Sequence, residues 1–174
     1  MQMDAALREA LQHKIDTKTK PLGALGRIED LAAQIGMLQG RLDPVAERCG
    51  LTIFAGDHGL ADAGVSAFPK AVTHEMVKTF MAGGAAANAF ADALGVFVRV
   101  VDAGIETPVE HPNLLSRRIG PGTANSAEGP AMMRYEAEEA MATGRALGAE
   151  WDFPVVAYGD MGIGNTATSA LLIH

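Results

Sequence analysis

A glycine-rich segment near the end of the chain combines residue types that can bind an anion. It runs FPVVAYGDMGIGNTATSA over residues 153–170. Its apolar start predicts a buried strand, its glycines predict a turn, and Asn165 and Thr166 favour the start of a helix. Backbone N–H groups at a turn that leads into a helix can bind phosphate. Asp160 adds a carboxylate at the carboxyl end of the strand, where open α/β sheets bind their ligands.

This turn does not match the two common nucleotide-binding fingerprints. Ala167 stands where a Gly-x-Gly-x-x-Gly pattern needs its third glycine, and no Gly-Lys-Ser/Thr follows. The spacing alone is therefore equally compatible with a strand-to-helix connection that binds nothing. It gives poor support to a dinucleotide-dependent oxidoreductase.

Asp57 and His58 directly follow a second apolar segment, residues 51–56, which predicts another buried strand. The pair can belong to the same site, or Asp57 can fix the turn through backbone hydrogen bonds. One His beside one Asp, with no third ligand at helical spacing, is too little for a zinc site, so we expect no metal. Thr123 and Asn125 are compatible with a turn, a helix entry or a substrate contact.

Strand and helix patterns alternate through the larger part of the chain. This alternation predicts an α/β fold with a Rossmann-like parallel sheet built from three βα units. We expect residues 1–45 to form an N-terminal helical segment of a smaller domain and residues 46–174 to form an α/β domain that is incomplete at its C-terminus. The expected strands are 51–56, 96–103 and 153–158, the expected helices are 1–13, 25–39, 73–94, 130–147 and 167 onward, and residues 104–129 form a long loop.

Composition narrows the class of protein further. The net charge is −7 at pH 7, which argues against nucleic-acid binding. No apolar stretch approaches the roughly 20 residues that span a bilayer, and the first residues do not resemble a signal peptide, so we expect a cytoplasmic protein without a membrane partner. A single cysteine, Cys49, excludes an internal disulfide. The cations expected to be solvated are Lys14, Lys18, Lys20, Arg117 and Arg118.

Five segments in order carry a resemblance to a known family. They are TKPLGALGRIEDLA (19–32), GDHGLADAGVSAFPKAVTHEMV (56–77), the AGGAAAN run with VRVVDAGI after it (82–105), GTANSAEGPAM (122–132) and GDMGIGNTATSA (159–170). The chain resembles the nicotinate-nucleotide:dimethylbenzimidazole phosphoribosyltransferases of cobalamin lower-ligand synthesis. Because several signals agree, an empty glycine turn becomes a much weaker interpretation.

The resemblance implies a reaction. Such enzymes transfer the phosphoribosyl group of nicotinate mononucleotide to 5,6-dimethylbenzimidazole and give α-ribazole 5′-phosphate and nicotinate. They need no cofactor and form homodimers with a Rossmann-like sheet and a smaller helical domain. Family members are longer, and the glutamate usually assigned as their general base has no counterpart here. We therefore expect this chain alone to be weak or inactive. A non-catalytic half-domain that binds benzimidazole or nucleotide, and one part of a split enzyme, stay open as alternatives.

The resemblance also implies site residues. Asp160 stands where the family usually has a glutamate, and the resemblance makes it the expected catalytic residue. The loop 65–70 resembles the azole pocket, in which Phe68 would pack against a flat ring and Lys70 stands where many relatives have glutamine. The expected substrate-binding residues are Asp57, His58, Ser66, Phe68, Lys70, Gly162, Ile163, Gly164, Asn165 and Thr166.

Overall fold

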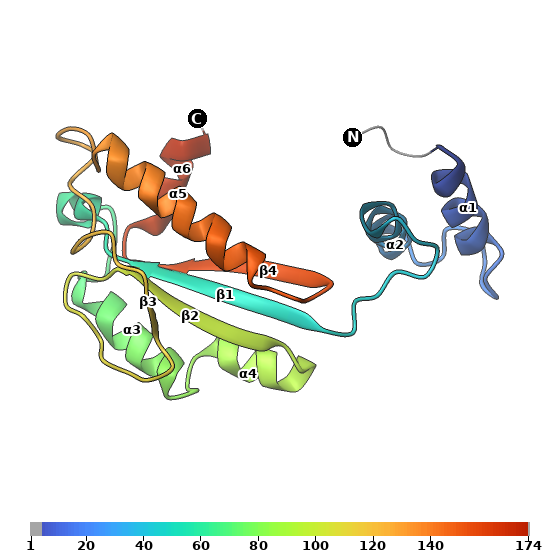
Figure 1. The fold of residues 1–174 in the computed structure, drawn as a ribbon, viewed down its shortest axis with the longest axis horizontal. Helices are drawn as coiled ribbons and strands as arrows, with labels where there is room; N and C mark the ends of the chain where they lie inside the picture. The colour runs from blue at the N-terminus through green and yellow to red at the C-terminus, as the bar shows by residue number, and fades with distance from the viewer. Residues whose placement is uncertain (1–4, 174) are drawn as a thin grey trace. The chain divides into compact units, whose positions relative to one another are not determined.

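The chain divides into two compact units in a computed structural model that describes residues 5–173. The first unit is Met1–Ala46 and the second is Glu47–His174. Figure 1 shows helices alone in the first unit and a sheet with helices in the second. No helix within residues 5–173 combines the length and the apolar character needed to cross a bilayer.

The N-terminal unit is a pair of helices, α1 (Ala5–Asp16) and α2 (Arg27–Gln39). Helix α1 ends three residues later than expected, and the start of the expected helix lies outside the described residues. The two helices meet where Leu11 packs on Gly36, and a Cβ on Gly36 would lie only 2.6 Å from Leu11 Cδ2. Gly40 then ends α2 in the left-handed conformation, with a φ of 66°.

Two of the lysines expected to be solvated form ion pairs in this unit. Lys20 Nζ lies 2.9 Å from Glu29 Oε1, and both side chains are almost fully buried. Lys14 pairs with Asp43. The expectation is therefore wrong for Lys20, because the loop between the helices folds its ammonium group back onto the first turn of α2.

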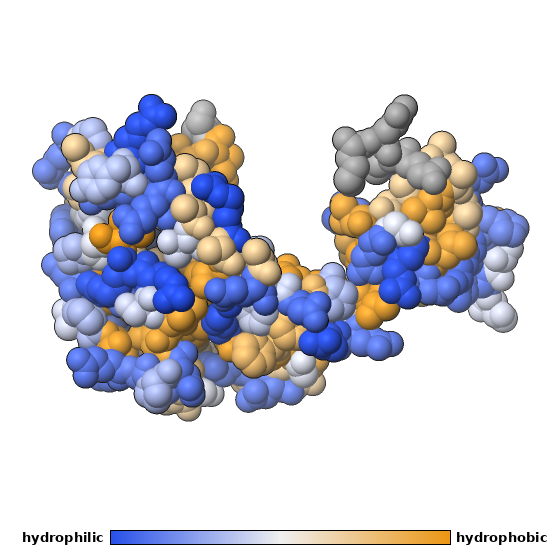
Figure 2. Space-filling view, in the orientation of Figure 1, coloured by the Kyte–Doolittle hydropathy of each residue, from blue (hydrophilic) through white to orange (hydrophobic). Residues whose placement is uncertain are grey.

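One side of α2 is apolar and exposed. Ile28, Leu31 and Leu38 are 64%, 47% and 68% exposed, and their spacing puts them on one side of the helix. We call these three residues the α2 stripe. Hydrophobic surface is visible on this unit in Figure 2. A surface of this kind is typical of a contact with another protein surface.

The second unit contains the expected parallel sheet, with one strand more than expected. The strands are β1 (Cys49–Gly56), β2 (Phe97–Gly104), β3 (Leu115–Ser116) and β4 (Val155–Met161), in the order β3-β2-β1-β4. All of their pairings are parallel. The α/β prediction is confirmed. The added strand β3 lies in the expected loop 104–129 and is only two residues long, too short to show a periodic pattern.

Helices cover both faces of this sheet. In Figure 1, α3 (Ala71–Met81) and α4 (Ala86–Leu94) lie on one face, and α5 (Arg134–Ala149) lies on the other. The single helix expected at 73–94 is wrong. Gly83 takes a φ of 74° after α3, and α4 restarts where Asn88 Oδ1 accepts a hydrogen bond from the N–H of Ala85. A left-handed residue cannot continue a right-handed helix.

The other boundaries differ from expectation by a few residues. Strand β4 continues to Met161, so Gly159 and Asp160 belong to the strand and not to the turn. Helix α6 (Asn165–Ile173) begins two residues earlier than expected, and α5 begins four residues later. A short 3₁₀ helix, η1 (Gly59–Ala63), follows β1.

The core lies between β1, β2 and α3. Ile53, Val100 and Phe80 form one buried cluster, and Ala55 and Val77 form a neighbouring one. On the opposite face of β1, Trp151 Nε1 donates to the hydroxyl of buried Thr52 at 2.7 Å. The cluster of Ala55 and Val77 lies near the carboxyl end of β1, where the candidate site lies.

Candidate active site

An open pocket of about 570 Å³ lies at the carboxyl ends of β1, β2 and β4. The chain runs from β1 outward to β2 and β3, then returns to the other side of β1 as β4. The pocket therefore lies at the topological switch point of the sheet, the usual ligand position in an open parallel sheet. It is lined by residues of β1, β2 and β4, of the loop before α5, and of α5 and α6 themselves.

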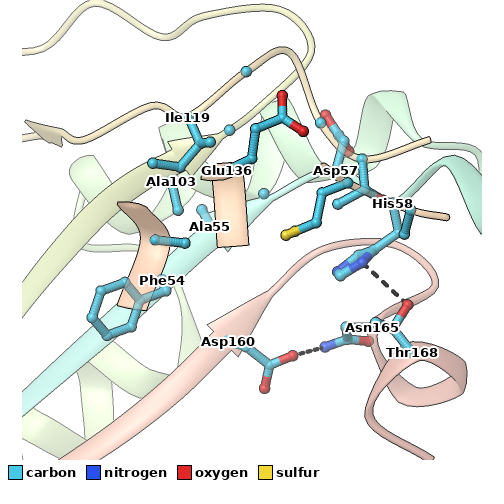
Figure 3. Close-up of a pocket in the computed structure, with 18 of the residues that line it drawn as sticks. Phe54, Ala55, Asp57, His58, Ala103, Ile119, Glu136, Asp160, Asn165 and Thr168 are labelled. Atoms are coloured by element: carbon cyan, nitrogen blue, oxygen red, sulfur yellow. Dashed lines mark hydrogen bonds between the residues drawn. The ribbon is translucent and has the colours of Figure 1, made fainter. Parts of the chain in front are cut away.

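The pocket combines apolar walls with a few charged side chains (Figure 3). Its apolar lining includes Phe54, Ile119, Met132, Met133 and Leu172. Its polar lining includes Asp57, His58, Arg117, Glu136, Asp160 and Asn165. Apolar walls with a few placed polar groups are typical of a small-molecule site. Within residues 5–173, no three His, Cys, Asp or Glu side chains gather closely enough to hold a metal ion.

Asp57 combines the two roles considered for it. Its side chain is 5% exposed, and its Oδ2 accepts a hydrogen bond from the N–H of Glu106 at 2.7 Å. Its own N–H donates to Gly104 O, and its carbonyl accepts from the N–H of Thr123. Asp57 thus ties together the ends of β1 and β2 and the loop before α5. It also borders the pocket, where its Oδ1 is buried and has no hydrogen-bond partner among the described residues.

His58 is held in the pocket by helix α6. Its Nδ1 lies 3.2 Å from Thr168 Oγ1, and a dashed line in Figure 3 marks this contact. Burial lowers the pKa of His58 below its ordinary value, while the negative charges of Asp160 and Asp57 oppose this effect. The imidazole is therefore neutral at pH 7, and a neutral imidazole can accept a proton.

Asp160 and Asn165 meet on the β4 side of the pocket. Asp160 Oδ2 accepts a hydrogen bond from Asn165 Nδ2 (Figure 3). Asn165 Oδ1 in turn accepts a hydrogen bond from the N–H of Thr166 at 2.8 Å, in the first turn of α6. The strand end and the helix start thus fix each other. The carboxylate that the sequence places at the end of this strand does lie in the pocket.

The glycine turn packs tightly against the residues that follow β1. A Cβ on Gly162 would lie 2.1 Å from Gly56 O and 2.9 Å from the ring of His58. The N–H of Ile163 donates to the buried hydroxyl of Thr73 at 3.1 Å. Among the residues Gly162, Ile163, Gly164, Asn165 and Thr166, Asn165 lines the pocket. The glycines thus serve close backbone packing here, and substrate contacts of the other four residues stay predictions.

The loop after β1 positions the expected azole-contact residues. Ser66 Oγ accepts a hydrogen bond from the N–H of Phe68, and the Phe68 side chain is 65% exposed. Lys70 Nζ lies 2.9 Å from Asp62 and 3.4 Å from Glu106, and the hydrogen bond with Asp62 raises the pKa of Lys70. Ser66, Phe68 and Lys70 are not among the residues that line the pocket. Their contact with substrate stays a prediction.

Thr123 and Asn125 have different roles. Thr123 accepts hydrogen bonds from the N–H of Gly59 through its carbonyl and its hydroxyl, and it lines the pocket. Asn125 forms a turn in which its side chain contacts Ala127 and Glu128. Thr123 therefore connects the loop before α5 to the start of η1.

Sequence reasoning missed several pocket residues. Glu136 lies in the first turn of α5, where its carboxylate accepts a hydrogen bond from the N–H of Met133 at 2.6 Å. Because the expected helix began at residue 130, Glu136 did not fall in its first turn, and nothing in the sequence indicated that this acid borders the pocket. Arg117 lines the pocket, and Arg118 Nη1 lies 2.9 Å from Asp102 Oδ2. The expectation of a solvated side chain is wrong for Arg118, because buried Asp102 draws it inward, whereas Arg117 is exposed at the rim of the pocket.

Comparison with known proteins identifies the family. A family model described as "Phosphoribosyltransferase" matches residues 1–174. The nicotinate-nucleotide–dimethylbenzimidazole phosphoribosyltransferase of Cupriavidus taiwanensis is 49% identical over 176 residues, which cover 99% of this chain and 51% of that relative. The enzyme of the same name from Geobacter sulfurreducens is 43% identical and is covered to 50%.

A solved structure agrees with this match. The crystal structure of the corresponding Thermus thermophilus phosphoribosyltransferase superposes with a TM-score of 0.88 at 43% identity, covering 98% of this chain and 53% of that one. The chain spans about half the length of the curated relatives it matches. It belongs to the nicotinate-nucleotide–dimethylbenzimidazole phosphoribosyltransferase family.

Proposed function

We propose that this chain takes part in phosphoribosyl transfer from nicotinate mononucleotide to 5,6-dimethylbenzimidazole. A bond forms between an azole nitrogen and C1 of the ribose, and the bond from that carbon to the pyridinium nitrogen breaks. Nicotinate leaves, the azole N–H proton passes to an acceptor, and α-ribazole 5′-phosphate is the product. The observation that carries this proposal is that four of the five segments on which the family resemblance rests contribute residues to the pocket: 56–77, 82–105, 122–132 and 159–170.

The chemical character of the pocket supports this reaction. Its apolar walls suit a flat, uncharged azole ring. Asp160 and Glu136 place carboxylates around the pocket, and positive charge develops on the ribose as the pyridinium leaves. The reaction needs little acid catalysis because the leaving group is already a cation, so positioning is the main task.

Asp160 is the proposed catalytic residue of this chain. Asn165, the first residue of α6, donates a hydrogen bond to the carboxylate of Asp160 and fixes its position. A carboxylate can accept the azole proton as the new bond forms. His58 is the second group in the pocket that can accept a proton, since its ring is neutral at pH 7. We further propose that Ser66, Phe68 and Lys70 contact the azole and that the turn Gly162–Thr166 contacts the phosphate or ribose.

The partner of this chain is proposed to be a second copy of itself. The α2 stripe is an exposed apolar surface on a small unit whose two described helices bury only Leu11 and Gly36 fully. A symmetric dimer that uses this stripe would remove it from water. The same stripe can meet another part of a longer family member, so oligomeric state needs a direct measurement.

A turnover assay tests the proposed function. The purified 174-residue chain is incubated with nicotinate mononucleotide and dimethylbenzimidazole, and α-ribazole 5′-phosphate and nicotinate are separated by chromatography. We expect slow product formation that the Asp160→Asn variant reduces by about 100-fold, the lower range of general acid–base catalysis. The Asp152→Asn variant is the control, because Asp152 is an exposed acid before β4 that does not line the pocket.

A second candidate function is binding without turnover. It is favoured by the pocket itself, whose apolar walls and few polar side chains suit ligand binding whether or not a reaction follows. In that case calorimetry detects binding of dimethylbenzimidazole or nicotinate mononucleotide, while the assay yields no product. A chain that binds neither compound and forms no product would exclude both functions.

A further inference from the structure

We propose that Arg117 binds an acidic oxyanion group of the ligand, either the phosphate or the carboxylate. This inference rests on the proposed function for the identity of the ligand, nicotinate mononucleotide, which carries both groups. It assigns a specificity role to a residue that the sequence suggested was only solvated.

The charge of the pocket requires a cation near an acidic ligand. Asp57, Glu136 and Asp160 all line the pocket, and like charges oppose the entry of an anion. Among the described residues that line it, Arg117 is the one lysine or arginine. A guanidinium group is always charged and presents parallel N–H donors that match phosphate and carboxylate oxygens.

Several backbone donors that often bind phosphate are already occupied around this pocket. The N–H of Met133 at the start of α5 donates to Glu136, and the N–H of Thr166 in α6 donates to Asn165. The N–H of Ile163 in the glycine turn donates to Thr73. Helix starts bind anions through such N–H groups. Because these N–H groups already donate to protein atoms, we expect a side chain to bind the anion instead.

Arg117 is available for this task, and its neighbour Arg118 is not. Arg118 forms an ion pair with buried Asp102. The backbone N–H of Arg117 donates to Asp102 O, which fixes the residue at the end of β3, and its Nη1 donates to the neutral carbonyl of Ser116. Within the described part of the chain, no carboxylate lies within ion-pair distance of Arg117. Its charge is therefore uncompensated at the rim of the pocket.

The test measures ligand binding by the whole 174-residue chain in low salt. Calorimetry compares wild type with Arg117→Gln and Arg117→Lys, and Arg134→Gln is the matched control. Arg134 is an exposed arginine of α5 that pairs with Glu138 and does not line the pocket. We expect Arg117→Gln to weaken nicotinate mononucleotide binding by about tenfold or more, as expected for a lost charge-assisted hydrogen bond. The affinity of Arg117→Lys should lie between those of wild type and Arg117→Gln, and Arg134→Gln should bind as tightly as wild type does.

Two further ligands identify the group that Arg117 binds. Nicotinamide mononucleotide keeps the phosphate and lacks the carboxylate, and nicotinate riboside has the reverse. If Arg117 binds the phosphate, Arg117→Gln weakens the binding of nicotinamide mononucleotide and leaves the binding of nicotinate riboside unchanged. If it binds the carboxylate, the pattern is reversed. Either pattern supports the inference.

Failure of the inference and failure of the proposed function give different results. Equal binding of nicotinate mononucleotide by wild type and Arg117→Gln overturns the inference and leaves the proposed function intact. If wild type binds inorganic phosphate through Arg117 but does not bind nicotinate mononucleotide, the proposed function fails and the inference stands. A wild-type chain that binds neither compound overturns both.

Discussion

At the scale of single residues, His58 is the most informative group in the pocket. Burial lowers its pKa, and the nearby charges of Asp160 and Asp57 act in the opposite direction. A histidine whose pKa is lower in the folded state than in the unfolded state resists protonation only while folded. As the pH falls below the ordinary value of about 6.5, the unfolded chain takes up a proton that the folded chain refuses. This histidine therefore makes the fold less stable in acid.

The balance at His58 gives a direct prediction. The Asp160→Asn variant removes a negative charge that favours the imidazolium, so the pKa of His58 should fall further. Nuclear magnetic resonance titration of the His58 ring protons measures this change. The Asp152→Asn variant removes a charge outside the pocket and should leave the titration of His58 unchanged. An unchanged or raised pKa in Asp160→Asn would contradict the described proximity of the two side chains.

Pocket residues at strand ends could be predicted from the sequence. Pocket residues in the segment between β2 and β4 could not. Asp57, His58 and Asp160 directly follow or end apolar strand segments, and the ends of parallel strands meet at one edge. Glu136 comes from α5, which begins four residues later than expected, and its place in the pocket depends on how that helix packs on the sheet. Arg117 and Arg118 are adjacent and chemically identical, so only the position of buried Asp102 separates their roles.

At the scale of elements, glycines allow three loops at the carboxyl ends of the strands to pack closely on one another. Gly162 contacts the carbonyl of Gly56, and Gly59 packs so closely on residues 123–125 that a Cβ would lie 2.5 Å from Ala124 C. Gly122 packs on Asp57 in the same way. The sequence indicates glycine-rich loops here, but it favours a ligand as the reason. In the structure, these glycines instead let the backbone of one loop pack directly against the backbone of another. Such packing depends on contacts between segments far apart in the sequence.

This close packing predicts opposite effects of one substitution at two glycines. Gly162→Ala should destabilise the fold by at least about 1–3 kcal/mol, because the new methyl group would meet rigid backbone. Gly144→Ala on α5 should stabilise it by about 0.5–1 kcal/mol, since nothing lies within 4 Å and alanine favours a helix. Urea denaturation measures both. If Gly162→Ala is as stable as wild type, the tight packing is not present in solution.

The βα alternation could be predicted because each long strand is a mostly apolar run. The pair Gly83-Gly84 does mark the break between α3 and α4, but the alanines on both sides continue the apolar pattern and favoured a single helix. Strand β3 was also missed, because two residues carry no periodic signal. It is defined by pairing with β2 at Val101 and Asp102, which is a tertiary property.

At the scale of the whole molecule, the α2 stripe predicts self-association. Wild type should form a dimer, and the Ile28→Glu variant should shift it toward monomer by placing a charge in an apolar contact. Ala142→Glu adds the same charge at an exposed position of α5, in the second unit, and is the control. Sedimentation equilibrium measures both. If wild type is monomeric, or if both variants dissociate equally, the stripe is not a dimer contact.

The strand order has a consequence for the stiffness of the pocket. Strand β1 has a hydrogen-bonded strand on each side, whereas β4 is paired on one side only in the described sheet. Backbone amides of a central strand exchange with solvent only when the sheet opens, and those on the free side of an edge strand exchange readily. Asp57 and His58 extend from the stiff strand, and Asp160 belongs to the compliant one. In the described sheet we therefore expect the β1 wall of the pocket to be the less mobile one and the β4 wall to adjust more as a ligand enters, and hydrogen exchange of the two strands measures this difference.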